Sequence, residues 1–231
     1  MLRWAYQDGI DWITSTNGTR WLHIGEAALV VAPISIYDVD VSRSVRKLRE
    51  GKDSPFLDFA NELGGPAAFV IPAGTFAASF AIGDTKFQDA AFTSLQSVLY
   101  TQIVVFALKT VIGRARPTES PDDAHNFNPF SDPNAAFPSG HASMAFAWTT
   151  PWVYYYPHPI TYSLFGLAVG TAIARVERQK HWLTDVLAGS AIGFATARWL
   201  TRKHQRASAS SLSVEPRMGL RSAALAVRYQ F

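Results

Sequence analysis

His181 lies in a segment whose residue types and spacing suit nucleophilic catalysis. The segment reads Arg175-Val-Glu-Arg-Gln-Lys-His-Trp-Leu-Thr-Asp185, so the histidine precedes an aspartate by four residues. Residues four apart lie on one face of a helix, where a carboxylate can fix the imidazole tautomer and leave the other ring nitrogen as a base or nucleophile. Arg175 could add a positive charge from upstream. By itself, the pattern also fits a routine helical ion pair.

A second histidine, His141, stands in Phe137-Pro-Ser-Gly-His-Ala-Ser143, directly before an apolar run. Proline, serine and glycine before such a run predict a helix start, whose first N–H groups have no partner within the helix and can bind an anion. Gly140 would let the backbone approach that anion closely, and His141 would project from the same turn. The alternative is a capping turn that carries an incidental histidine.

Two cations precede this turn in Lys109-Thr-Val-Ile-Gly-Arg-Ala-Arg116-Pro117. They are seven residues apart, close to two helical turns, so both side chains point the same way. Pro117 ends the helix there. An arginine fork and a lysine point charge suit a multiply charged anion such as a phosphate. A basic helix end that complements the helix dipole is the simpler alternative.

Together, the three segments resemble the signature of the type 2 phosphatidic acid phosphatase superfamily, which includes bacterial acid phosphatases, lipid phosphate phosphatases and vanadium haloperoxidases. The matching order is Lys-x6-Arg-Pro, then Pro-Ser-Gly-His, then Arg-x5-His-x3-Asp, and the resemblance covers about residues 100–200. The third motif usually begins Ser-Arg, whereas here it begins Ala174-Arg175. The change removes one supporting hydroxyl group and no expected catalytic group.

The resemblance implies metal-independent hydrolysis of phosphate monoesters through a phosphohistidine, without a cofactor. His181 would attack phosphorus, Asp185 would orient it, and His141 would protonate the leaving alkoxide and later activate water. Cations and a helix N-terminus would neutralise the phosphoryl oxygens without a metal. The residues implied to bind phosphate are Lys109, Arg116, Ser139, Gly140 and Arg175.

Three other functions share these residues. A phosphotransferase with a non-water acceptor would form the same phosphohistidine, and a vanadium-dependent haloperoxidase would use His181 to hold vanadate. The third alternative is a non-catalytic helical membrane or interaction protein. The substrate is expected to be a phosphate ester. The apolar helices mildly favour an ester that is linked to a lipid.

The elements that must position these residues read as helices. Six apolar stretches predict core helices, and their lengths favour helices over strands; they are about 22–36, 66–83, 92–112, 142–156, 160–176 and 184–200. The fold class is therefore all-α, a single bundle formed by residues 1–205. Residues 37–61 look like charged surface structure, and 117–138 form a long loop between the first two motifs.

The last residues, 206–231, are expected to form a Ser-rich linker and a strand-like tail. Residues 225–231 alternate apolar and polar side chains, which is the period of a strand. A lone strand is unstable, so this one must pair with another strand, pack on the bundle or remain loose. The terminal Phe231 resembles the end of bacterial outer-membrane barrel strands. It points to the bacterial cell envelope, with the active site on the periplasmic side.

The amino-acid composition limits the classes of partner that the protein is expected to bind. The 231 residues are 48% hydrophobic and 17% charged, whereas soluble domains average about 25% charged residues. The mean hydropathy of +0.03 is modest for a chain with many membrane spans. We therefore favour a bundle that is soluble or peripheral to the membrane over an integral membrane protein. The net charge is +3 with scattered cations, which indicates no nucleic-acid partner, and the absence of cysteine excludes thiolate chemistry.

Several titratable residues fall outside the three motifs. We predict structural or surface roles for His23, His158 and His204, and we do not place the loop residue His125 in the site. Arg114 and Arg178 flank motif positions, and we expect both to be solvated.

Overall fold

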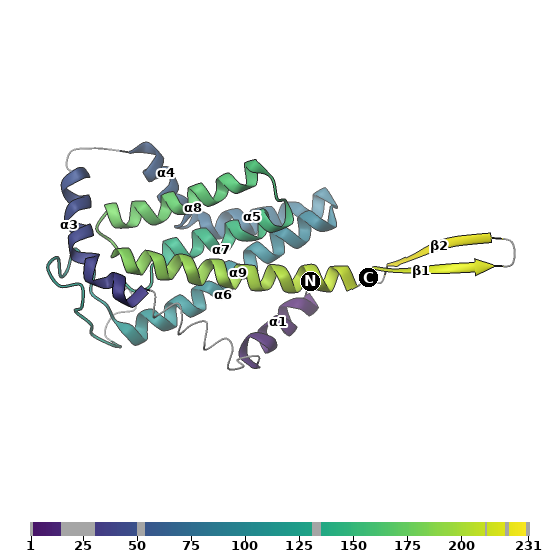
Figure 1. Ribbon diagram of the computed structural model, residues 1–231, viewed down its shortest axis with the longest axis horizontal. Coiled ribbons are helices and arrows are strands. Elements are labelled where there is room, and N and C mark those ends of the chain that lie inside the picture. The colour runs from purple at the N-terminus through teal and green to yellow at the C-terminus, as the bar shows by residue number, and fades with distance from the viewer. Residues whose placement is uncertain are drawn as a thin grey trace.

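The protein is described by a computed structural model over residues 2–14, 31–49, 54–130, 135–210, 212–219 and 222–229. Up to residue 210 the described residues form an all-α bundle, as the apolar stretches predict, and two strands follow it (Figure 1). The α-helices are α1 (Leu2–Thr14), α3 (Asp38–Arg49), α4 (Pro55–Leu63), α5 (Ala67–Ile82), α6 (Thr85–Ile112), α7 (Gly140–Tyr155), α8 (Pro159–Glu177) and α9 (Leu183–Ser210), with a short 3-10 helix η1 (Ser35–Tyr37).

Five of the six predicted core helices are present, as α5 to α9. The sixth stretch, 22–36, lies mostly outside the described residues. The segment 37–61 is more regular than expected, because it contains α3 and α4 rather than irregular surface structure. A local signal marks the second of these helices: Ser54 caps α4 by accepting a hydrogen bond from the Leu57 N–H, and Pro55 occupies its first turn.

Helix α7 is the centre of the bundle and packs against α6, α8 and α9. Two glycines of α9 allow its backbone to touch that of α7. A Cβ added at Gly189 would lie 2.4 Å from the Ser139 carbonyl oxygen, and one at Gly193 would lie 2.1 Å from that of Ser143. Only glycine fits at these distances, so the start of α7 is held directly against α9.

The outer surface of the bundle is apolar along several helices. Helices α6 and α8 are long and apolar enough to cross a membrane, and α4 with α5 forms a third candidate span bent by 60°. Large exposed hydrophobic side chains lie along α5, α6 and α8; they include Val70, Phe80, Ile103, Phe106, Val169 and Ile173. These findings support association with a membrane.

After α9, the chain forms two antiparallel strands, β1 (Leu212–Gly219) and β2 (Ser222–Tyr229). The expected strand is therefore confirmed over 225–229, while residues 230 and 231 lie outside the described part of the chain. Its partner is β1, in a register that pairs Leu212 with Tyr229 and Gly219 with Ser222. Helix α9 continues to Ser210, so the first residues of the predicted linker are helical, and the domain division at 205 stays a prediction.

Candidate active site

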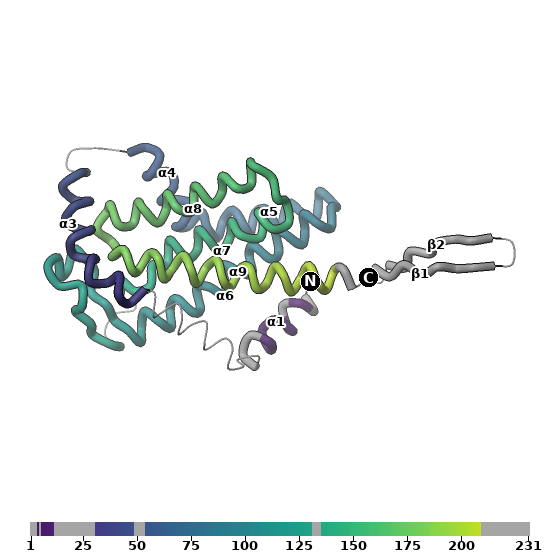
Figure 2. Tube along the Cα trace, in the orientation of Figure 1, coloured from purple at the N-terminus to yellow at the C-terminus, as the bar shows by residue number. Residues whose placement is uncertain are grey.

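Four helix ends meet at one end of the bundle, beside α3. They are the C-terminal ends of α6 and α8 and the N-terminal ends of α7 and α9 (Figure 2). Backbone contacts join them: the Ser139 N–H donates a hydrogen bond to the Asp185 carbonyl oxygen at 2.9 Å, and the Lys109 ammonium donates to the Ala135 carbonyl. The three sequence motifs therefore share one end of the molecule.

His181 is almost fully buried, with 3% of its surface exposed. Its Nδ1 lies 2.7 Å from the Ala136 carbonyl oxygen, which can only accept a hydrogen bond. Nδ1 must therefore carry the proton, and Nε2 is left as the basic nitrogen. Within the described residues no hydrogen bond occupies Nε2, so its lone pair is available for reaction.

Asp185 does not make the direct bond that its spacing suggests. Its Oδ2 lies 3.7 Å from His181 Nδ1 and instead accepts a hydrogen bond from the Trp182 N–H, while Oδ1 pairs with Arg114. Both carboxylate oxygens are thus committed elsewhere. The i, i+4 spacing brings Asp185 close enough to act on the imidazole as a charge, but the Ala136 carbonyl fixes the tautomer.

The pKa of His181 is lowered to about 4, mainly because the imidazole is buried. The carboxylate of Asp185 raises that pKa in opposition, and the charges of Lys109 and Arg175 lower it further. His181 is therefore neutral at pH 7. Neutral imidazole is the form that can attack phosphorus.

His141 lies in the first turn of α7 and is half-buried. Burial is the main cause that lowers its pKa to about 3, followed by the charges of Arg175, His181, Lys109 and Arg116. These groups belong to the other two motifs, and each is near enough to His141 for its charge to lower the pKa of that imidazole. The turn between α4 and α5 closes over the same ring, because a Cβ added at Gly65 would lie 3.3 Å from His141 Nε2.

The remaining predicted phosphate ligands differ in how they are held. Arg175 is 9% exposed, and its NH1 donates a hydrogen bond to Asn61 Oδ1 at 3.0 Å, while its Nε is buried without a partner among the described residues. Ser139 is fully buried and caps α7, where its hydroxyl accepts from the Ala142 N–H at 3.4 Å. Its hydroxyl therefore organises the helix start at Gly140.

Arg114 is the residue that sequence reasoning placed wrongly. It is 3% exposed rather than solvated, and it forms ion pairs of 2.7 Å with both Asp185 and Asp38. Its Nε–H also donates to the Ala124 carbonyl at 2.8 Å. Asp38 is fully buried as well and accepts from the Thr184 N–H at 3.0 Å. No local pattern identifies this network, because Asp38 is 76 residues away from Arg114.

The other residues left out of the site lie elsewhere. Arg178 forms a partly exposed ion pair with Asp58, and His125 lies within 3.2 Å of Ser35 Oγ on the surface. His158 caps α8, and His204 is buried at the opposite end of the bundle. Both of these histidines have the structural roles expected of them, while His23 lies outside the described residues.

Comparisons with known proteins give a family and a fold for this chain. Residues 90–209 match the family model described as the PAP2 superfamily. LpxE from Aquifex aeolicus has the same fold, with a TM-score of 0.53 and 20% identity over 71% of this chain and 94% of that one. A transmembrane PAP2-type phosphatidylglycerolphosphate phosphatase from Bacillus subtilis gives a TM-score of 0.57 and 21% identity over 79% and 94%. No curated protein sequence matches the chain significantly.

Proposed function

The chain belongs to the PAP2 superfamily, and we propose that it hydrolyses lipid-linked phosphate monoesters through a phosphohistidine on His181. The observation that carries the proposal is the state of His181. Its Nδ1–H donates a hydrogen bond to the Ala136 carbonyl, which leaves Nε2 as the basic nitrogen, and the charges of Lys109 and Arg175 act on the same imidazole. A neutral nucleophile among fixed cations is what attack on a phosphate needs.

In the first step, Nε2 of His181 forms a bond to phosphorus as the bond from phosphorus to the alkoxide oxygen breaks. His141 gives its proton to that oxygen, so the product alcohol leaves neutral. The charges of Lys109, Arg116 and Arg175 all act on His141, and these cations would stabilise the charge on the three equatorial oxygens. The N–H groups at the start of α7 would add a further electrostatic contribution.

In the second step, a water molecule attacks the phosphohistidine. His141, now neutral, takes a proton from that water as the new oxygen–phosphorus bond forms. The nitrogen–phosphorus bond then breaks, inorganic phosphate leaves, and His181 returns to its neutral state. The same imidazole thus serves as acid and then as base.

Because the pKa of His141 is low, the imidazole must gain its proton when substrate binds. In the free site, burial and the surrounding cations keep the imidazole unprotonated at neutral pH. A bound phosphate dianion would offset those cations and raise the pKa of His141. Substrate binding therefore supplies the charge that lets His141 hold the proton it must deliver.

The Asp38–Arg114–Asp185 network would hold the histidine segment in place. Asp185 accepts from the Trp182 N–H, the residue after His181, and Arg114 fixes that carboxylate from the other side. We assign these residues a positioning role. They act on the nucleophile through the backbone and through charge at 3.7 Å.

We also propose that the bundle is inserted in the bacterial envelope membrane, with the active site on the periplasmic side. The exposed apolar side chains of α5, α6 and α8, and the candidate spans among these helices, support insertion over the soluble or peripheral placement expected from the mean hydropathy. The active site would then lie at the level of the lipid headgroups. A lipid phosphate could reach it without leaving the bilayer.

The test uses the full chain in detergent micelles with EDTA. Phosphatidate, lipid A phosphate, isoprenyl diphosphate and p-nitrophenyl phosphate are assayed, and enzyme pulsed with labelled substrate is quenched in alkali. We expect turnover of at least one lipid phosphate and an acid-labile, alkali-stable label on His181 that His181→Ala abolishes. A label that persists in His181→Ala would disprove the assignment. An added alcohol that captures most of the phosphoryl group would favour a phosphotransferase.

A further inference from the structure

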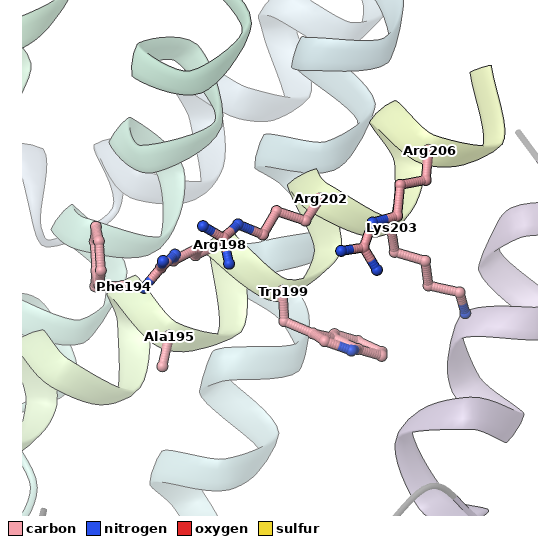
Figure 3. A pocket seen from close by; sticks show the side chains of 7 residues that line it. All are labelled: Phe194, Ala195, Arg198, Trp199, Arg202, Lys203 and Arg206. Carbon is pink, nitrogen blue, oxygen red and sulfur yellow. The ribbon is translucent and has the colours of Figure 1, made fainter. Parts of the chain in front are cut away.

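The outward face of α9 changes character along its length. Its first half exposes the apolar residues Leu187, Ala191 and Ala195. The same face then carries three arginines spaced four residues apart, at positions 198, 202 and 206. Residues four apart on a helix are neighbours, so the three guanidinium groups form one cationic stripe (Figure 3).

The stripe lines a groove of about 680 Å³, together with Phe194, Ala195, Trp199 and Lys203. Lys203 is already neutralised, because its ammonium lies 2.6 Å from Asp8 and 2.5 Å from Asp11. Among the described residues no carboxylate forms an ion pair with the three arginines, and Arg198 Nε is buried without a hydrogen-bond partner. The groove therefore has an excess of positive charge that the described part of the chain does not balance.

The position of the stripe matches the thickness of a bilayer. Arg202 in the stripe lies 17 positions after Asp185 of the candidate active site. At a rise of about 1.5 Å per residue, the two are about 26 Å apart along α9, close to the ~30 Å of a hydrocarbon core. The apolar outward residues of α9 lie between them. The stripe is thus placed at the membrane surface opposite the active site.

We propose that this groove binds the phosphate headgroup of an anionic phospholipid in the leaflet opposite the active site. Arginine forks suit phosphate oxygens, and tryptophan beside cations is typical of a membrane–water interface. The inference rests on the proposed membrane insertion and not on the chemistry of His181. Such a site would fix the depth and orientation of the bundle in the bilayer.

The test measures the melting temperature of the full chain in neutral detergent micelles, titrated with phosphatidylglycerol or phosphatidylcholine. Wild type is compared with Arg202→Gln/Arg206→Gln, in which both changed residues are exposed. The matched control is Arg46→Gln/Lys47→Gln on α3, which removes the same charge from another exposed surface. Turnover of p-nitrophenyl phosphate by all three proteins checks the fold and the proposed catalysis separately.

We expect phosphatidylglycerol, but not phosphatidylcholine, to raise the melting temperature of wild type and control. The concentration for half the effect should rise about tenfold or more in the double arginine variant. An equal response of the variant, or an equal effect of the neutral lipid, would overturn the proposal. It would also fail if inorganic phosphate or a short single-stranded DNA reproduced the shift at the same concentration.

Discussion

Two histidine–aspartate pairs lie at opposite ends of α9, and their difference shows how a reactive histidine is recognised. His204 is 1% exposed, and both of its ring nitrogens are occupied: Nδ1 lies 2.7 Å from Thr93 Oγ1, and Nε2 lies 2.8 Å from Asp8 Oδ2. His181 is equally buried, yet only its Nδ1 is bonded among the described residues. The Thr–His–Asp set has the composition of a catalytic triad, but its imidazole is fully used in structure.

The side chains around the two histidines also differ: His204 lies among aromatic rings, whereas His181 lies near cations. The ring of His204 stacks on Trp4 at 4.5 Å and lies near Phe92, so it ties α1 to the bundle. The charges of Lys109 and Arg175 act on His181 and lower the pKa of its imidazole. Burial and a nearby carboxylate are thus common to both pairs. The ring nitrogen of His181 that has no hydrogen bond among the described residues distinguishes the pair for which we propose catalysis.

The sharpest test of this contrast replaces each histidine in turn and compares the loss of activity with the loss of stability. His181→Ala should lower kcat/KM by about 10⁴-fold or more, since it removes the nucleophile, and it should also cost stability because the Ala136 carbonyl loses a buried partner. His204→Ala should retain activity and cost about 1–3 kcal/mol of stability, because Asp8 and Thr93 lose a buried partner. Steady-state kinetics and chemical unfolding in micelles measure both effects. Loss of activity in the His204 variant with an intact fold would remove the distinction.

The buried ion network beside His181 gives the next largest effect. Arg114→Met should destabilise the protein by about 3–5 kcal/mol, because it leaves Asp38 and Asp185 buried without their cation. The control is Arg178→Met, which breaks the exposed pair with Asp58 and should cost less than about 1 kcal/mol. Denaturant midpoints compare the two variants. Equal midpoints would mean that the network does not hold this end of the bundle.

The acid role of His141 predicts a dependence on the leaving group. His141→Ala should slow an alkyl phosphate about 100-fold or more, because an alkoxide needs a proton as it departs. With p-nitrophenyl phosphate the loss in the first step should be much smaller, since p-nitrophenolate leaves without one. Single-turnover rates isolate that step from hydrolysis of the phosphohistidine. Equal losses with both substrates would exclude His141 as the acid.

The smallest expected effect concerns pH and stability. The pKa of His181 is about 4 in the folded protein and about 6.5 when unfolded, so the unfolded chain binds the proton more readily between these values. This contribution to stability is present above pH 6.5 and falls by about 1.4 kcal/mol per pH unit as pH drops toward 4. His181→Asn should show a correspondingly weaker dependence in the same unfolding titration. An unchanged slope would mean that His181 is not held neutral by the fold.

The sequence by itself determined the elements that carry the site. The helix start at Ser139 is a local pattern, and α7 begins where that pattern places it. Two other helix bounds differ from the prediction: α6 ends at Ile112, so Arg116 lies beyond the helix that carries Lys109, and α9 begins at Leu183, so His181 precedes the helix that carries Asp185. The alternation of 225–229 likewise predicted a strand. Local patterns succeed here because backbone conformation and the period of apolar burial involve residues only a few positions apart.

Only the tertiary structure decided how the chosen residues are held. It brought the Ala136 carbonyl to His181 across 45 residues, Asp38 to Arg114 across 76, and Asp8 to His204 across 196. It also placed Arg114 in the interior, although its flanking position suggested a solvated side chain. Such pairings depend on which helix ends meet, and that is set by packing contacts such as those of Gly189 and Gly193. Periodicity along one helix contains no information about a partner on another.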